Sequence, residues 1–436
     1  MLNSHEKIDE MLKQGIFPDY TYSYPSKKDY HKLNIDIGNL WAQSSFDKIN
    51  IYFHIPFCLK KCKFCNLYST DNYSKDIKEA YVNAVLKQIE AHGERLKGAK
   101  VDSVYFGGGT PTILTEKNFS DIFHTLHKYF SIDPTESEIT VEGCPITIKN
   151  AEFKLSVIKD LGVNRISVGV QSFKENELLY FGRSHDVKNI ENAIEIIKRI
   201  GFKITNIDLI YGLINQSLDD WSYSLEKLLI YRPEAATLYP LNIRENTSLF
   251  SCDGAISRSD KLYLMYDYAS ELMVRNGYSH DTYVLFTDSS SSFGYKQQEN
   301  EFLSFPILGI GMAARSYIGA VQYSSYDDTM CNLTDISEYI NNISTNPFVA
   351  KKGIILKKQD QMKRYVVLRL LLFNRGLQLD EFYEKFNIDF KNIFEKEFRW
   401  LFDNEMIICY NKRILLNNKG KKFSNYLPIL FYRNDL

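Results

Sequence analysis

The stretch Ile51-Tyr52-Phe53-His54-Ile55-Pro56-Phe57-Cys58 decides the fold, and Cys62 and Cys65 follow it closely. Its apolar and β-branched residues predict a buried strand, so the cysteines, spaced C-x3-C-x2-C, fall on the loop after that strand. Thiolates are the usual ligands of iron–sulfur clusters, and three of them on one loop can each bind one iron of a four-iron, four-sulfur cluster. We therefore predict that Cys58, Cys62 and Cys65 are metal ligands at a catalytic centre.

The same loop offers no fourth ligand, because Asn66, Leu67 and Tyr68 follow the last cysteine. One iron would then stay open to bind a substrate or cofactor, as the free position of a catalytic zinc site does. A structural zinc site and three buried cysteines are the alternatives. Zinc would need a further Cys or His nearby, and His54 lies inside the predicted strand, where its side chain is hard to bring round. The motif favours the cluster.

Composition describes an ordinary globular protein. The 436 residues allow two or three domains, and 44% hydrophobic with 25% charged residues is typical of globular chains. The formal net charge of −1 gives no general attraction to nucleic acid or to a membrane surface. The polar start and the lack of a run of about 18 apolar residues predict neither a secretory signal nor a membrane span.

Cysteine usage indicates the compartment. The chain has seven cysteines, and the four outside the motif are scattered, which is not a disulfide framework. A low-potential cluster also needs reducing surroundings. We expect a cytoplasmic protein.

From about residue 49, short β-rich runs alternate with amphipathic helical patterns, which predicts parallel βαβ units. Six strands with interleaved helices predict an α/β fold, a partial (β/α)6 TIM-type barrel, with its site on the loops after the strands. The predicted strands are Ile49–Ile55, Val101–Phe106, Glu138–Val141, Arg165–Val170, Lys203–Ile210 and Ala235–Leu241. The predicted helices are Lys75–Leu96, Lys117–Tyr129, Glu152–Leu161, Val187–Ile200 and Leu218–Leu229.

After about residue 330 the pattern changes to helices at Gln359–Phe373, Leu379–Phe386 and Phe390–Phe402, then a hairpin around Asn411-Lys412 and a short helix near Lys421. We predict a lead-in of loosely ordered chain over residues 1–45, the barrel over 46–330, and a small helical, winged-helix-like domain over 331–436. That domain could bind nucleic acid or pack against the barrel. The short Lys419-Gly420-Lys421-Lys422 cluster has no interleaved aromatics, which favours packing.

Polar and glycine positions gather at the predicted strand ends. Gly107, Gly108, Gly109 and Thr110 follow the second strand, where glycines let backbone and its N–H groups approach a ligand. The later strands end near Glu142, a carboxylate that can accept hydrogen bonds, near Gln171, whose amide can recognise polar groups, and near Arg183, which can pair bidentately with a carboxylate. Asp208 lies within an apolar strand, where an ionisable residue is rarely without a role.

The three-cysteine spacing resembles that of the radical S-adenosylmethionine (SAM) enzymes. More narrowly, the chain resembles the oxygen-independent coproporphyrinogen III oxidases and their relatives over about residues 50 to 320, with a weaker match beyond. The resemblance rests on Tyr-x-His-Ile-Pro-Phe-Cys at Tyr52–Cys58, Gly-Gly-Gly-Thr-Pro-Thr at Gly107–Thr112, Gly162–Ser167, Gly169–Phe173 and Asp208–Leu213.

The resemblance implies a [4Fe-4S] cluster on the three cysteines, with SAM bound to its open iron. At matching positions it implies that Tyr52, Gly108 and Glu142 contact this SAM. Some members bind a second SAM, whose contacts match Phe64, Gly109, Thr110, Gln171, Arg183 and Asp208.

Three departures bear on the subfamily. The porphyrinogen oxidases carry a further cysteine two places after the motif, where this chain has Leu67. The haem-chaperone relatives carry His-Asn-x-x-Tyr-Trp before a Leu-Gly-Ile-Gly loop; here Leu308–Gly311 is present, but Tyr295-Lys296-Gln297-Gln298-Glu299 stands in the earlier place. Gly311–Tyr317 resembles another branch, and its Arg315 either recognises an anionic substrate or is structural.

By resemblance we expect reductive cleavage of SAM to a 5′-deoxyadenosyl radical. A second SAM would serve transfer of a one-carbon (methyl) unit to, or oxidation of, an sp² or tetrapyrrole-like carbon. The alternatives are coproporphyrinogen III oxidase-like chemistry, anaerobic haem degradation of the anaerobilin synthase type, and a haem chaperone with little catalysis. The expected partners are a small-molecule substrate and an electron donor such as flavodoxin or ferredoxin, without membrane or nucleic acid.

Overall fold

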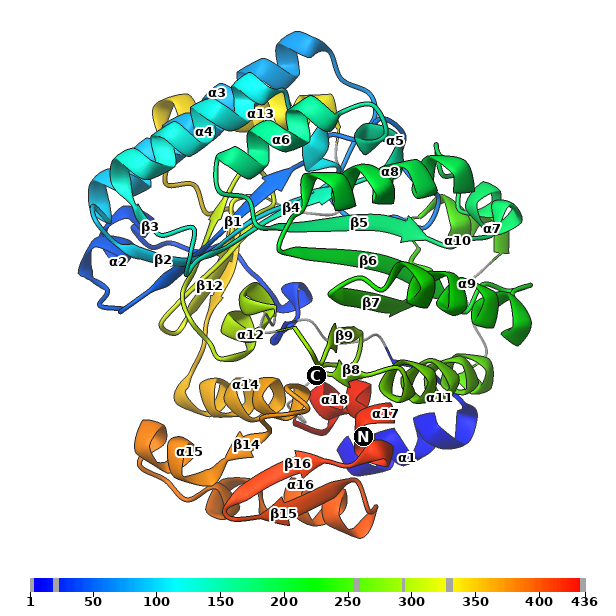
Figure 1. Cartoon of the computed structure of the whole chain (residues 1–436). Helices are drawn as coiled ribbons and strands as arrows, with labels where there is room; N and C mark the ends of the chain where they lie inside the picture. Colours follow the sequence, from blue (N-terminus) through cyan, green and yellow to red (C-terminus); the bar gives the residue numbers. More distant parts are fainter. Residues whose placement is uncertain are drawn as a thin grey trace.

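The computed structural model describes residues 4–18, 23–245, 247–253, 259–291, 295–326 and 332–431. One large sheet dominates the described chain, with helices on its outer face and a smaller helical part beneath it (Figure 1). Its strand order is β13-β12-β11-β10-β1-β2-β4-β5-β6-β7-β9-β8, with β3 (Ser131–Ile132) paired to β2 off this path.

Six strands in chain order form the parallel centre of the sheet, which confirms the predicted α/β fold of partial-barrel type. These strands are β1 (Ile49–Ile55), β2 (Lys100–Gly108), β4 (Glu138–Gly143), β5 (Arg165–Gln171), β6 (Ile204–Tyr211) and β7 (Ala235–Pro240). The connecting helices are α3 (Lys75–Arg95), α4 (Glu116–Tyr129), α5 (Pro145–Ile148), α6 (Glu152–Asp160), α7 (Glu175–Tyr180), α8 (Val187–Ile200) and α9 (Leu218–Tyr231).

Side-chain alternation along the strands explains how the sheet is covered. On β1, Ile51 and Phe53 are fully buried, while Tyr52 between them is only partly buried. Successive residues of a strand point to opposite faces, so the apolar set packs under the helices and the other set faces the barrel interior. The partly buried inward residues on the neighbouring strands are Tyr105, Glu142, Asp208 and Tyr239. The interior is therefore lined by polar and aromatic groups.

Both edges of the sheet carry strands that the sequence did not predict. β10 (Ile307–Ile310) pairs in parallel with β1, and β11 (Arg315–Ile318), β12 (Val321–Ser324) and β13 (Lys352–Ile355) continue antiparallel. β9 (Leu285–Asp288) and β8 (Tyr278–His280) extend the other edge. The predicted division at residue 330 remains a prediction, and β13 beyond it belongs to the large sheet. The remaining helices of this part are α10 (Ser248–Asp253), α11 (Ser259–Arg275), α12 (Lys296–Phe302) and α13 (Leu333–Thr345).

The C-terminal part contains the predicted three helices and hairpin. They are α14 (Lys358–Leu371), α15 (Leu379–Phe386), α16 (Phe390–Asp403), β15 (Ile407–Tyr410) and β16 (Arg413–Leu416), followed by α17 (Asn418–Lys422) and α18 (Leu427–Phe431). β14 (Leu377–Gln378) completes a three-stranded sheet of order β14-β16-β15. Lys422 of the predicted basic cluster pairs with Asp267 of α11 at 2.5 Å, which ties this part to the barrel.

The N-terminal lead-in is not loosely ordered over its described residues, so that expectation is wrong. It contains α1 (Ser4–Gln14) and α2 (Ile37–Gln43), and Ile8 and Trp41 on them are fully buried. Trp41 Nε1 donates to the Tyr323 hydroxyl at 2.7 Å, and the Tyr426 hydroxyl donates to Ile16 O at 2.6 Å. The segment was misjudged because its packing partners lie about 280 or more residues away along the chain.

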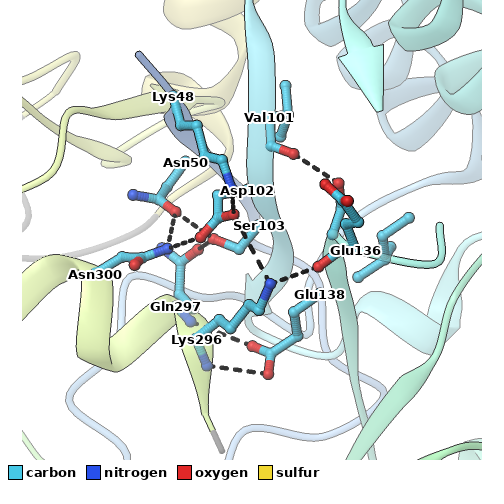
Figure 2. A network of polar contacts seen from close by, with 12 residues as sticks. Lys48, Asn50, Val101, Asp102, Ser103, Glu136, Glu138, Lys296, Gln297 and Asn300 are labelled. Atoms are coloured by element: carbon cyan, nitrogen blue, oxygen red, sulfur yellow. Dashed lines mark hydrogen bonds and ion pairs between the residues drawn. The ribbon is translucent and has the colours of Figure 1, made fainter. Parts of the chain in front are cut away.

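A polar network closes the barrel at the amino ends of the strands, opposite the cysteine loop (Figure 2). Asn300 on α12 donates to Asn50 Oδ1 and to Asp102 Oδ2, each at 2.8 Å, and Lys48 pairs with Asp102 at 2.8 Å. The backbone N–H of Lys296 donates to Glu138 Oε2 at 3.1 Å. A carboxylate at a helix N-terminus is stabilised by the unpaired N–H groups there, so Glu138 anchors α12 under the strands.

Within the described ranges, no helix is both long enough and apolar enough to cross a membrane.

We predict that Asn300→Ala destabilises the chain by about 1–3 kcal/mol, because it removes a buried donor from Asn50 Oδ1 and from Asp102 Oδ2. Urea denaturation followed by circular dichroism measures the loss. The exposed Asn83→Ala on α3 is the matched control and should stay within about 0.5 kcal/mol of wild type. Equal stability of the two variants would show that the network in Figure 2 does not hold the barrel floor.

Candidate functional site

The cysteine loop lies directly against the glycine run, as the parallel pairing of β1 and β2 requires. Gly109 N donates to Ile55 O at 2.7 Å, and Thr110 N donates to Phe57 O at 2.8 Å. A Cβ on Gly109 would stand 2.6 Å from Phe57 O and 3.0 Å from Cys58 Sγ, so only glycine fits there. These N–H groups bond β1 and its loop, so the expectation that they face a ligand is wrong for Gly109 and Thr110.

The three motif cysteines are close enough to influence one another. Burial raises the pKa of Cys58 to about 12, and the neighbouring Cys65 and Cys62 raise it further against the hydrogen bond from Thr110. Thr110 Oγ1 donates to Cys58 Sγ at 3.6 Å. Among the described residues, no three His, Cys, Asp or Glu side chains are placed to hold a single metal ion. A four-iron cluster binds each thiolate through a different iron, so its ligands need not converge on one point.

Tyr52 and His54 form the layer beneath the glycine run. His54 Nε2 lies 2.7 Å from Tyr68 O and therefore carries the proton, so Nδ1 accepts from the Tyr52 hydroxyl at 3.1 Å. Gly108 has φ of 110°, and a Cβ there would stand 2.7 Å from the imidazole. His54 thus packs against Gly108 and bonds the backbone of the cysteine loop at Tyr68.

Two inward carboxylates lie near each other across the barrel. Glu142 accepts from the Tyr105 hydroxyl at 2.6 Å, and Asp208 accepts from Asn206 Nδ2 at 2.7 Å and from Ser167 Oγ at 3.2 Å. Burial raises the pKa of Glu142 to about 7, and the charge of Asp208 adds to this shift. Burial also raises the pKa of Asp208 to about 6, against its hydrogen bonds. Both groups can therefore change protonation near neutral pH.

Gln171 stands in a strained position at the end of β5. Its φ is 74°, and the pairing of β5 with β6 shifts register between Gly169 and Gln171, which marks a bulge. The bulge re-aims the side chain, whose buried Oε1 has no partner within the described residues. Such strain is found where a side chain must be held for function. Gly169 makes room for it, because a Cβ there would stand 2.8 Å from Gln171 Nε2.

Arg183 reaches the cysteine motif from the loop after α7. Its Nη1 donates to Cys62 Sγ at 3.1 Å, and its Nη2 donates to Cys144 Sγ at 3.3 Å and to Gly169 O. Cys144 Sγ also lies 3.4 Å from His185 Nδ1. Sequence analysis did not single out Cys144 or His185, which stand two places after Glu142 and Arg183, because only folding brings these segments together.

Phe64 and Arg315 have structural partners. Phe64 packs edge-on against Phe181, with 5.0 Å between ring centroids, and so joins the cysteine loop to the end of α7. Arg315 lies 3.5 Å from Glu301 and donates to Ser23 Oγ. These contacts favour the structural role for Arg315 over recognition of a substrate.

Comparison with known proteins agrees with this geometry. Residues 52–228 match the Radical SAM superfamily. This segment is a radical SAM domain. The chain is 25% identical over 389 residues to the haem chaperone HemW of Lactococcus lactis. That match covers 88% of this chain and 97% of the relative. It is 26% identical over 405 residues to the oxygen-independent coproporphyrinogen III oxidase of Salmonella typhimurium. That match covers 88% of this chain and 85% of the relative.

The chain has the fold of the coproporphyrinogen III oxidase HemN of Escherichia coli, with a TM-score of 0.80 and 21% sequence identity. The superposition covers 97% of this chain and 98% of HemN. The predicted resemblance to the coproporphyrinogen III oxidase-like family is therefore confirmed. Superfamily membership implies a [4Fe-4S] cluster and SAM, and the site fits both. It offers three thiols on one loop, a glycine run that leaves no side chain beside them, and a buried amide oxygen on Gln171 that has no partner among the described residues.

The raised pKa of Glu142 predicts a pH-dependent stability. Between its ordinary value of 4.5 and about 7, the folded state keeps a proton that the unfolded state releases, so the free energy of unfolding falls as pH rises. Glu142→Gln removes this pH dependence. The stability of the variant relative to wild type, measured by thermal unfolding, should therefore increase from pH 4.5 to pH 7 and stay constant above pH 7. The exposed Glu90→Gln is the control and should follow wild type. A constant difference between Glu142→Gln and wild type would contradict the shift.

Proposed function

We propose that this chain is a radical SAM enzyme that binds its cluster through Cys58, Cys62 and Cys65 and SAM in the adjoining barrel interior. The observation that carries the proposal is the contact of the cysteine loop with the glycine run above an inward-facing polar lining. When bound, the cluster supplies the electron that cleaves SAM to methionine and a 5′-deoxyadenosyl radical.

The chain's own residues orient the reactants and keep water out. Gly109 lets the cysteine loop approach β2, and Thr110 donates to Cys58 Sγ and holds that sulfur in place. Glu142, deprotonated above about pH 7, can accept hydrogen bonds from ribose hydroxyls or face a sulfonium. Tyr52 and Tyr105 stack with 6.0 Å between ring centroids and form an aromatic wall beside it. A radical reaction needs its reactants held in a fixed orientation inside a shielded pocket.

A second SAM would lie farther along the barrel rim. In the part of the chain that the structure describes, Gln171 Oε1 is buried without a partner. The Asp208 carboxylate is held by three polar neighbours, so both groups can engage a further polar ligand. Of the other residues expected there, Thr110 adjoins Cys58, Phe64 packs against Phe181, and Arg183 joins Cys62 to Gly169 O; Gly109 bonds Ile55 O through its backbone. We propose that a second SAM bound there transfers a methyl group to an sp² or tetrapyrrole-like carbon. Oxidation of a coproporphyrinogen-like substrate, or anaerobic ring opening of haem, would use the same pocket.

Cys62→Ala should abolish cluster loading and SAM cleavage, since it removes one of three ligands on the loop. The measurement is iron content and 5′-deoxyadenosine formed from SAM with dithionite after anaerobic reconstitution. Cys409→Ala, an exposed cysteine on β15, is the matched control and should retain wild-type values.

Full iron loading and full 5′-deoxyadenosine formation by Cys62→Ala would refute the cluster assignment. S-adenosylhomocysteine among the wild-type products would mark methyl transfer. Substrate turnover without S-adenosylhomocysteine would contradict the two-SAM proposal and favour the oxidation alternatives.

A haem chaperone is the second candidate, because relatives with that name align over nearly their whole length. In this chain, the segment where such relatives carry His-Asn is Tyr295 followed by α12, and Asn300 of that helix bonds the barrel floor. No histidine stands there to meet a haem iron.

We expect that haem added to the reconstituted protein produces no stable shift of the haem absorption band unless haem is the substrate. A one-to-one shift that persists in Cys62→Ala, together with no 5′-deoxyadenosine from wild type, would favour the chaperone. A shift that decays only with SAM and reductant would favour ring opening.

A further inference from the structure

Arg183 is held by three acceptors from three separate segments. Cys62 lies on the loop after β1, Cys144 on the loop after β4, and Gly169 within β5. The two sulfur contacts are 3.1 Å and 3.3 Å long, and they join residues 121 and 39 positions apart. A guanidinium has a rigid fork of donors, so three acceptors on fixed backbone leave it little freedom to turn.

The charge on this side chain is secure. A guanidinium stays protonated in proteins at any ordinary pH. A permanent cation therefore touches one of the three proposed cluster ligands.

Cys144 and His185 fix the far side of the guanidinium. His185 Nε2 lies 3.4 Å from Val170 O, and a carbonyl can only accept, so this nitrogen carries the proton. Its Nδ1 is then an acceptor for the Cys144 thiol at 3.4 Å, while the Cys144 sulfur accepts from Arg183 at 3.3 Å. Burial and the charge of Arg183 lower the pKa of His185 to about 3, so the imidazole is neutral and does not repel the guanidinium.

We propose that Arg183 donates a hydrogen bond to the cluster-ligating sulfur of Cys62 and raises the reduction potential of the cluster, with Cys144 as its positioning residue. Hydrogen bonds and nearby charge are established determinants of iron–sulfur potentials. A cation stabilises the reduced cluster, which carries one more negative charge, more than the oxidised one. This inference rests on the proposed function, because it needs the cluster on Cys62.

The role differs from contact with a second SAM and is compatible with it. Nη1 has a further N–H beyond the bond to Cys62, and the buried Nε has no partner within the described residues. Either of these donors can bond an acceptor of a ligand while the other N–H groups hold the sulfurs and Gly169 O. A measurement made without SAM therefore isolates the effect on the cluster.

The test is a redox titration of the reconstituted holoprotein, followed by electron paramagnetic resonance in the absence of SAM. Arg183→Gln should shift the midpoint potential to a more negative value, because it removes the charge. Arg183→Lys keeps the charge without the fork and should shift it less. Cys144→Ala should give a smaller shift of the same sign. Arg199→Gln, an exposed residue paired with Glu152, is the control and should not shift it.

A fully loaded Arg183→Gln protein with an unchanged or more positive potential would overturn the inference. If that variant loads no cluster, Cys144→Ala decides in its place, and a potential equal to wild type would overturn it. Failure of the wild-type protein itself to load a cluster would instead refute the proposed function, so the two failures are distinct.

Discussion

The structure depends on how closely the loop after β1 can approach the end of β2. Parallel strands end at the same edge of a sheet, and here Ile55 pairs with Gly108 in register. The cysteine loop then crosses the glycine run, where a Cβ on Gly109 would collide with Phe57 O and approach Cys58 Sγ. Backbone hydrogen bonds from Gly109 and Thr110 lock this contact. The cysteine sulfurs lie where they do because Gly109 has no side chain and because the register of β1 with β2 brings their loop beside it.

The second constraint is the polarity of the barrel interior. Burying Glu142 and Asp208 is costly unless their charges are lost or bonded, and both have raised pKa values together with hydrogen-bond donors. The floor network around Asp102 and Glu138 closes the opposite end of the strands (Figure 2). Polar groups are thus concentrated inside a scaffold that is closed at the end away from the cysteine loop. Apolar side chains on the outer face supply the packing that holds this scaffold.

Much of this architecture could be predicted from local patterns. The six parallel strands and the five longer helices between them were found because apolar runs and helical periodicity repeat along the chain. The cysteine spacing singled out the loop that carries the proposed cluster ligands. Edge strands such as β11 and β12 were missed because each spans only four residues. The order of the lead-in was missed because Trp41 is buried by residues far along the chain. Arg183, Cys144 and His185 come together only in the folded chain. No sequence spacing could therefore predict that Arg183 bonds both Cys62 and Cys144 or that Cys144 contacts His185.

The most direct test of the central claim is the metal and sulfide content of protein purified without oxygen, combined with the electron paramagnetic resonance spectrum of the reduced sample before and after SAM is added. We expect about four irons and about four inorganic sulfides per chain, and a spectrum that changes on addition of SAM because one iron lacks a protein ligand. Zinc in place of iron, absence of sulfide, or a reduced cluster whose spectrum ignores SAM would contradict a three-cysteine cluster with an open iron.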